Sequence, residues 1–251
     1  MRLSAALIVP LGLLLFALAE AQQPQDAAYT AKIRELTITD PKWKFTTELV
    51  DHLPASTTVP TPLKVLGYVP GTIGKLSHVA DINRYFEALT DASPRTKWFS
   101  MGMSDEGREM IVVAIADEQT IKRLDEYRAM TARLADPRSL TAVERARLIK
   151  TAKPIYYLTG SIHSPETGSP EMLMELAYRL AVDESPHTRS IRANVITLIT
   201  PVLEVDGRDH VVDTYALSKS LGLGPTGVHW SIGAATPPTT IIATGWWSPR
   251  S

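Results

Sequence analysis

Residues 154–166 read P-I-Y-Y-L-T-G-S-I-H-S-P-E, and this stretch carries the clearest structural signal in the chain. A run of β-branched and aromatic residues is interrupted at Gly160, which is typical of a strand that ends in a loop. The loop then holds His163 and Glu166, three positions apart. In open α/β sheets, ligands bind outside the carboxyl ends of the strands. We therefore expect this imidazole and this carboxylate to emerge together at such an edge.

The His163–Glu166 pair has the chemistry of two zinc ligands. Zinc accepts imidazole nitrogen and carboxylate oxygen, and a catalytic zinc site has three protein ligands and one open position for water. The pair would supply two of the three. The alternative is that His163 is an ordinary loop histidine and that Glu166 only favours the start of the helix after it. The buried-strand pattern before the pair and the amphipathic pattern after it favour the metal site.

A longer pattern around this pair resembles the zinc carboxypeptidases of peptidase family M14. In that family the first ligand pair is H-x-x-E, placed directly after a core strand. Here the pair is followed by a helical pattern at residues 170–181, a strand pattern at 194–202 and the segment L-E-V-D-G-R at 203–208. The resemblance covers roughly residues 67–224 and implies that the pair binds Zn2+.

The segment L-E-V-D-G-R both matches the family and departs from it. Its residues 206–208 match an N-P-D-G-R-like motif, which the resemblance places in a loop near the site, with Arg208 as a candidate substrate-binding residue. Residues 204–205 (E-V) stand where the family has Asn-Pro. Pro165 stands where many members carry a basic residue that helps to hold the substrate. Substrate specificity therefore stays open.

The amino terminus reads as a secretory signal peptide. Arg2 gives a short basic start, residues 7–19 form an apolar run, and residues 19–21 (A-E-A) form a cleavage site before Gln22. The protein is therefore expected to be secreted or periplasmic, with no stable membrane association after cleavage. An amino-terminal membrane anchor is the alternative, and the shortness of the apolar run argues against it.

Composition and charge limit the remaining possibilities. The chain has 251 residues, 44% hydrophobic and 21% charged, which is enough for one sizeable core. The net charge of −1, with Lys and Arg spread along the chain, excludes nucleic acid as an expected partner. The chain has no cysteine, so a metal site must use His, Asp, Glu and water. We expect a signal peptide at 1–21, an N-terminal lead at 22–66, the N-terminal part of an M14-like catalytic domain at 67–224 and an aberrant tail at 225–251.

Alternating helix and strand patterns predict an α/β fold, a sheet with helices on both faces. The resemblance to the zinc carboxypeptidases implies that this sheet is mixed. A capping box, Thr141 with Glu144, precedes one of the helices. In the helix at 170–181, the apolar side chains recur at helical spacing and should face the sheet; they are Met172, Leu173, Leu176, Ala177 and Leu180. Further helices are expected at 79–89, 118–134 and 142–151, and further strands at 97–103 and 110–116.

The resemblance also implies residues that this sequence does not show. The family's third zinc ligand is a histidine much later in the chain, and its catalytic glutamate comes later still. His210 follows the D-G-R residues too closely to be that ligand. The general base is therefore assigned to no residue here, and we expect an N-terminal fragment whose hydrolysis is weak or absent. The sheet should be incomplete at its C-terminal side.

The segment 225–251 has no periodicity and carries two adjacent tryptophans. If residues 239–247 are read one base earlier, starting from the last base of the Pro238 codon, the codons permit His-Asp-Asn-Asn-Arg-Asp-Gly-Met-Val. An Asn-Arg pair after a short acidic lead is what the family uses to grip the terminal carboxylate of the substrate, and arginine grips carboxylate through two parallel hydrogen bonds. We expect a frameshift between about residues 224 and 230. The nucleotide sequence tests this.

The resemblance implies a zinc-dependent metallocarboxypeptidase that acts on peptides, inactive or weak in this truncated form. One alternative is an N-acyl amino acid deacylase of the same fold, against which the N-P-D-G-R-like motif argues. A second is a non-catalytic exported domain that binds peptides or cell-wall fragments. A third is a fragment that does not fold stably because a sheet edge is left open.

Overall fold

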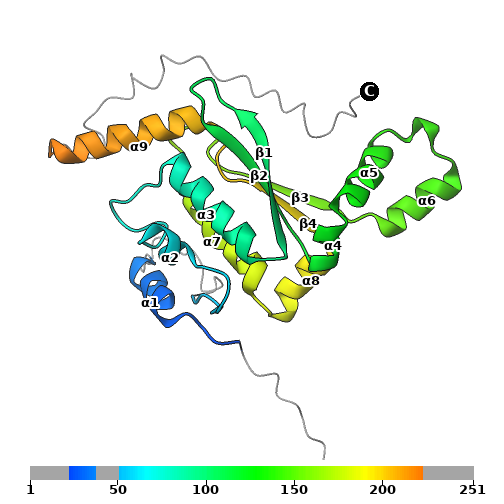
Figure 1. The fold of residues 1–251 in the computed structure, drawn as a ribbon, viewed down its shortest axis with the longest axis horizontal. Helices are drawn as coiled ribbons and strands as arrows, with labels where there is room; N and C mark the ends of the chain where they lie inside the picture. The colour runs from blue at the N-terminus through cyan, green and yellow to red at the C-terminus, as the bar shows by residue number, and fades with distance from the viewer. Residues whose placement is uncertain (1–22, 38–50, 223–251) are drawn as a thin grey trace, which may run out of the picture.

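A four-stranded mixed sheet lies at the centre of the fold (Figure 1). The structure is a computed structural model that describes residues 23–37 and 51–222. β2 runs antiparallel to both β1 and β4, and β3 runs parallel to β4. In spatial order the strands are β1 (Thr96–Met103), β2 (Glu109–Ile115), β4 (Ile196–Thr200) and β3 (Ile155–Thr159).

Helices cover both faces of this sheet, as the sequence predicts (Figure 1). The helices are α1 (Ala27–Leu36), α2 (Pro62–Leu66), α3 (Val79–Ala92), α4 (Glu118–Lys122), α5 (Leu124–Ala135), α6 (Ala142–Thr151), α7 (Gly168–Val182), α8 (Pro186–Asn194) and α9 (Val205–Ser220), with a 3-10 turn at Pro137–Ser139.

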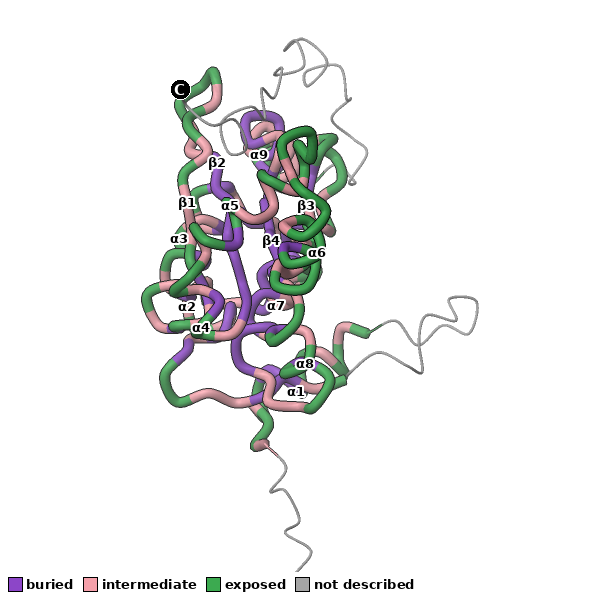
Figure 2. Tube along the Cα trace, turned by 90° about the vertical axis from the view of Figure 1, so that its right-hand side faces the viewer, coloured by how far each residue is buried: buried purple, intermediate pink, exposed green. Residues whose placement is uncertain are grey.

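Strand β2 separates two hydrophobic cores. Its side chains alternate between the faces of the sheet, so Ile111 and Val113 pack with α3 and α7, whereas Val112 and Ala114 pack with α4 and α5. Figure 2 shows the buried residues concentrated along β2, β4 and α7, and mostly exposed residues along α6. The larger of the two cores lies between the sheet and helices α3 and α7.

The connection from β3 to β4 decides where the two sequence motifs meet. Because β3 and β4 are parallel neighbours, the chain crosses over through α7 and α8, and both strands end at the same edge of the sheet. The loop at 160–167 follows β3 and the segment at 201–204 follows β4. The H-x-x-E motif and the D-G-R motif are therefore side by side, although about forty residues separate them in sequence.

Several local predictions are confirmed and two are corrected. The capping box of Thr141 and Glu144 is present at the start of α6. The helix predicted at 118–134 is instead two helices, because the backbone leaves the helical region at Arg123 (φ −115°, ψ 20°). The prediction that Met172 faces the sheet is wrong: its side chain is 52% exposed, whereas Leu173 on the next position is buried.

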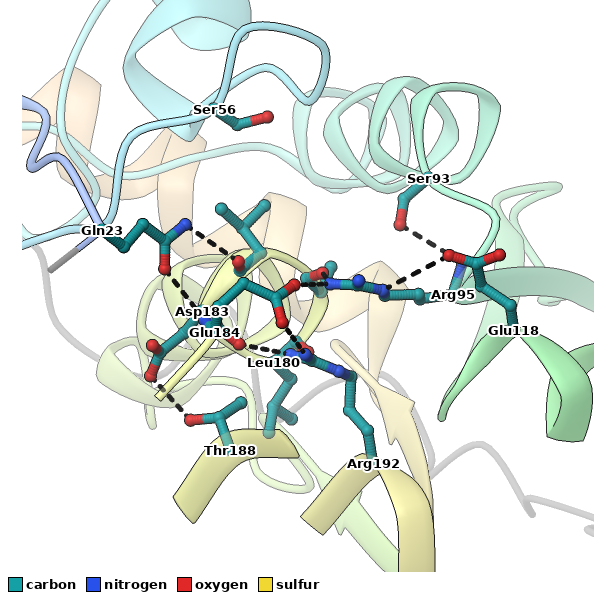
Figure 3. A network of polar contacts seen from close by, with 12 residues as sticks. Gln23, Ser56, Ser93, Arg95, Glu118, Leu180, Asp183, Glu184, Thr188 and Arg192 are labelled. Atoms are coloured by element: carbon teal, nitrogen blue, oxygen red, sulfur yellow. Dashed lines mark hydrogen bonds and ion pairs between the residues drawn. The ribbon is translucent and has the colours of Figure 1, made fainter. Parts of the chain in front are cut away.

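A polar network ties the N-terminal lead to the C-terminal end of α7 (Figure 3). Arg192 is buried and pairs with Glu184, which also pairs with Arg95. The side-chain amide of Gln23 donates to the carbonyl of Val182 at 3.1 Å and accepts from the backbone N–H of Glu184 at 2.8 Å. The start of the described chain is thereby fixed to a turn far away in sequence.

The predicted signal peptide at 1–21 and the predicted tail at 225–251 lie outside the described residues. Part of the predicted lead, residues 38–50, lies outside them as well. Among residues 23–37 and 51–222, no helix has the length and apolar composition needed to cross a membrane.

Candidate metal-binding site

His163 and Glu166 lie in the loop between β3 and α7, beyond the C-terminal end of β3. The ring nitrogen Nδ1 of His163 is 3.0 Å from Oε1 of Glu166, and the backbone N–H of His163 donates to Oε2 of Glu166 at 3.3 Å. The side chains are 74% and 53% exposed. The hydrogen bonds from His163 lower the pKa of Glu166, so this carboxylate stays ionised at neutral pH.

The pair fits two ligand positions of a zinc ion but does not complete a site. Two ligands at the corners of a tetrahedron with zinc bonds of about 2.0–2.1 Å are about 3.3 Å apart. The 3.0 Å separation of the two side-chain atoms is close to this value, so a metal could replace their hydrogen bond with little movement. In residues 23–37 and 51–222, no group of three His, Cys, Asp or Glu side chains is arranged to hold a metal ion. A third protein ligand would have to come from outside those residues.

The histidine nearest the D-G-R motif is engaged elsewhere. His210, in α9, lies 2.9 Å from a carboxylate oxygen of Glu106 in the β1–β2 turn. It does not join the His163–Glu166 pair in a metal-binding group. The prediction that His210 is not the third ligand stays a prediction.

The D-G-R residues lie in the first turn of α9 and not in the predicted loop. The backbone N–H of Arg208 donates to the carbonyl of Glu204 at 3.1 Å, which closes the first helical turn. Asp206 falls in that turn, where its negative charge is favourable at a helix N-terminus. Only residues 201–204 lie between β4 and α9. The D-G-R residues therefore fall inside the helix and not in a loop.

Arg208 is fully buried in this structure. Its guanidinium donates to the carbonyl of Ser77 from Nε at 3.0 Å and from Nη2 at 2.9 Å, and Nη2 pairs with Glu171 at 2.7 Å. Nη1 donates to the carbonyl of Thr167 at 3.1 Å. Burial lowers the pKa of Arg208, and the charge of Glu171 acts in the opposite direction. The guanidinium has no exposed surface in this structure, and this burial favours a structural role over the predicted contact with a substrate.

Asp206 ties α9 to the β1–β2 turn. Its carboxylate accepts hydrogen bonds from the Ser104 hydroxyl at 2.6 Å and from Arg108 Nη1 at 2.7 Å. Burial alone would raise the pKa of Asp206, but these hydrogen bonds outweigh it and lower the pKa below its usual value. Asp206 is therefore a buried structural acid next to the loop and not a free carboxylate in it.

Sequence reasoning missed the contacts that hold the loop. Ser164 donates to Glu204, and Ser161 has a left-handed backbone conformation with φ of 48°. The signal in the sequence was Gly207, because a glycine inside a motif often marks a close approach of two chain segments. A Cβ atom at Gly207 would lie 2.0 Å from Oγ of Ser164.

Comparison with known proteins decides the family. The sequence model of the family described as zinc carboxypeptidase matches residues 82–220, more than half of the chain. The chain belongs to this family, peptidase family M14. A search of curated proteins finds no match.

Three solved structures are among those to which the chain is similar. Thrombin activatable fibrinolysis inhibitor has a TM-score of 0.41 at 15% identity, and the match covers 57% of this chain and 29% of that one. Carboxypeptidase A from Helicoverpa armigera has a TM-score of 0.41 at 15% identity, with 60% and 32% covered. Bovine thrombin-activatable fibrinolysis inhibitor, in complex with tick carboxypeptidase inhibitor, has a TM-score of 0.36 at 15% identity, with 55% and 34% covered. The match spans about a third of the length of each of these structures.

Proposed function

We propose that this chain is a zinc-dependent metallocarboxypeptidase, in which His163 and Glu166 bind Zn2+ and the substrate is a peptide with a free C-terminal carboxylate. The observation that carries the proposal is the His163–Glu166 pair itself, exposed at the C-terminal end of β3 with its ligand atoms 3.0 Å apart. Membership of the zinc carboxypeptidase family supports it. The predicted signal peptide would place this activity outside the cytoplasm.

The chain's own residues would have defined tasks in such a site. Glu166 is held ionised by its contacts with His163, which keeps it ready as an oxygen ligand. Bound zinc supplies Lewis-acid chemistry in sites of this kind. His163 would orient its ring toward the same point, because its backbone N–H also holds the carboxylate of Glu166 beside it. We expect weak hydrolysis, since the described residues offer neither a third ligand nor an assigned general base.

A second candidate function is a non-catalytic exported domain that binds peptides or cell-wall fragments. The lack of a three-ligand group among the described residues favours it. It differs from the first proposal in a measurable way, because binding would survive the removal of zinc by a chelator. A deacylase of N-acyl amino acids remains distinguishable by its substrate.

Zinc stoichiometry and affinity test the proposal on the chain from Gln22 onward. We expect zinc binding by the wild type, and its loss in His163→Ala and in Glu166→Gln. His187→Ala is the matched control, because His187 is exposed in α8, outside the motif. Zinc that binds equally well to His163→Ala, or no zinc binding by the wild type, contradicts the proposed site.

Peptide hydrolysis gives the second arm. We expect the residual activity to require zinc and a free C-terminal carboxylate, so an amidated peptide of the same sequence should not be cleaved. Cleavage of the amidated peptide at an internal bond would contradict a carboxypeptidase. Release of an acyl group from an N-acyl amino acid, without peptide cleavage, would favour the deacylase.

A further inference from the structure

The loop that carries His163 and Glu166 is held by a second segment of the chain. We propose that residues 203–208 act as a clamp that fixes the loop at 160–167 before any metal binds, with Glu204 as the positioning residue at its centre. The inference rests on the proposed function, because the task of a fixed loop is to present two ligands to a metal. The clamp is made of backbone contacts, one charge-assisted hydrogen bond and a close approach at Gly207.

Backbone hydrogen bonds extend the pairing of β3 and β4 past the end of the sheet. The N–H of Gly160 donates to the carbonyl of Thr200 at 2.9 Å, and the N–H of Leu203 donates to the carbonyl of Gly160 at 2.8 Å. The N–H of Glu204 donates to the carbonyl of Ser161 at 3.1 Å. A side chain at Gly160 would lie 2.3 Å from a backbone oxygen of Pro201. The two segments therefore leave the sheet in contact.

The side chain of Glu204 reaches across to the middle of the loop. The hydroxyl of Ser164, between the two ligand residues, donates to Oε2 of Glu204 at 2.5 Å. Glu204 occupies the N-cap position of α9 but makes no capping hydrogen bond with its side chain. Its carboxylate is directed at the loop instead. A hydrogen bond to an ionised carboxylate is stronger than one between neutral groups.

Gly207 leaves the space that this hydrogen bond needs. A Cβ atom there would lie 1.9 Å from Oε2 of Glu204 and 2.0 Å from Oγ of Ser164. Real Cβ contacts are never this short, so any other residue would displace both partners. The hydrogen bond between Ser164 and Glu204 therefore requires glycine at position 207.

Further contacts, which do not involve the side chain of Glu204, fix the two ends of the loop. Ser161 is buried in a left-handed conformation, which is unfavourable for a non-glycine residue. Its N–H donates to the Ser169 hydroxyl at 3.0 Å, and its hydroxyl donates to the carbonyl of Glu166 at 3.1 Å. At the other end, Nη1 of Arg208 donates to the carbonyl of Thr167.

The clamp leaves the two ligand side chains free. Contacts fix the loop at 160–161, at Ser164 and at 166–167, whereas the side chains of His163 and Glu166 remain exposed. A site whose ligands are held in place before binding loses less entropy when the metal arrives. The structure thus assigns to residues 203–208 a role that their sequence alone did not indicate.

A double-mutant cycle on the purified chain tests the clamp. The variants are Ser164→Ala, Glu204→Ala and the pair of both, and amide hydrogen exchange of residues 161–167 is the first readout. We expect each single variant to raise exchange in this loop, and the double variant to raise it no further, because both remove one hydrogen bond. Glu204→Gln should restore most of the protection, since its amide oxygen can still accept from Ser164. Glu175→Gln in α7 is the control and should leave the loop unchanged.

Zinc affinity is the second readout, and it separates this inference from the proposed function. We expect Glu204→Ala to weaken zinc binding about tenfold, the lower end of what loss of a supporting contact costs at metal sites. Unchanged loop exchange in Ser164→Ala and Glu204→Ala overturns the clamp even if zinc binds. Additive effects in the double variant also overturn it. Raised exchange in a chain that binds no zinc would support the clamp and contradict the proposed function.

Discussion

Two acid–base pairs on neighbouring stretches of the chain have opposite surroundings. His163 and Glu166 are 74% and 53% exposed, whereas Arg208 and Glu171 are 0% and 6% exposed. An exposed ion pair contributes little to stability, because water can solvate both partners when they separate. A buried pair cannot separate without leaving a charge in a medium that solvates it poorly. The exposed pair is therefore able to exchange its hydrogen bond for a ligand. The buried pair is part of the packed structure that holds the loop at 160–167.

The largest effect should come from breaking the buried pair. Arg208→Met removes the positively charged partner of the buried Glu171 and the hydrogen bonds to the carbonyl of Ser77, and we expect a loss of about 3–5 kcal/mol in the free energy of unfolding. Urea unfolding measures it. Arg84→Met is the control, because Arg84 pairs with Asp81 on the exposed side of α3 and should cost less than about 1 kcal/mol. If Arg208→Met and Arg84→Met lost the same free energy of unfolding, the buried pair would contribute no more to stability than an exposed pair.

A smaller loss of stability is expected when one carbon atom is added at Gly207, where α9 meets the loop at 160–167. Gly207→Ala places a Cβ atom within 2.0 Å of Ser164 and Glu204, and overpacking of this kind costs about 1–3 kcal/mol. Gly168→Ala in the first turn of α7 is the control, since a Cβ atom there has nothing within 4 Å. We expect this control to be neutral or stabilising. A destabilised control and an unaffected Gly207→Ala would contradict the close approach.

Protonation of Asp206 at acid pH should lower the free energy of unfolding. The pKa of Asp206 is lowered in the folded chain, so the stability it contributes is present above its unfolded pKa of about 3.9 and is lost as the pH falls through the folded value. We expect Asp206→Asn to be less stable than the wild type at pH 7. The difference should shrink below about pH 4, as measured by urea unfolding across pH. If the stability difference between Asp206→Asn and the wild type grew toward acid pH, it would contradict the lowered pKa of Asp206.

The smallest effect on stability is expected at the exposed pair. His163→Ala removes an imidazole that makes no buried contact, and we expect the urea midpoint to stay within experimental error of the wild type. The same variant should lose zinc. A destabilisation comparable to that of Arg208→Met would show that the exposed pair stabilises the fold as much as the buried pair does, which contradicts the contrast between them.

The features predicted from sequence are those with a local cause. The capping box of Thr141 and Glu144 depends on residues three positions apart, and the strand that ends at Gly160 shows in its own composition. The position of His163 and Glu166 after that strand followed from the same pattern. The alternation of such elements was enough to predict an α/β fold with helices on both faces.

The features that were missed depend on contacts between distant residues. Arg208 is buried because it meets Glu171 and Ser77, which are 37 and 131 positions away in sequence. Met172 is exposed because the sheet meets another side of α7, and the amphipathic pattern alone did not fix that side. The start of α9 has no side-chain cap to mark it, since Glu204 is directed at Ser164. Sequence patterns carry no record of these partners.

The contacts of Gln23 join the N-terminal lead to a segment that is synthesised much later. Its side chain is bonded to Val182 and Glu184, which follow it by 159 and 161 residues. A ribosome produces Gln23 before both of these partners, which are made only when most of the described chain is already present. The N-terminal lead is therefore synthesised before the segment on which it docks. Until α7 is complete, these two bonds cannot form, and the lead is more accessible to a protease that acts during synthesis.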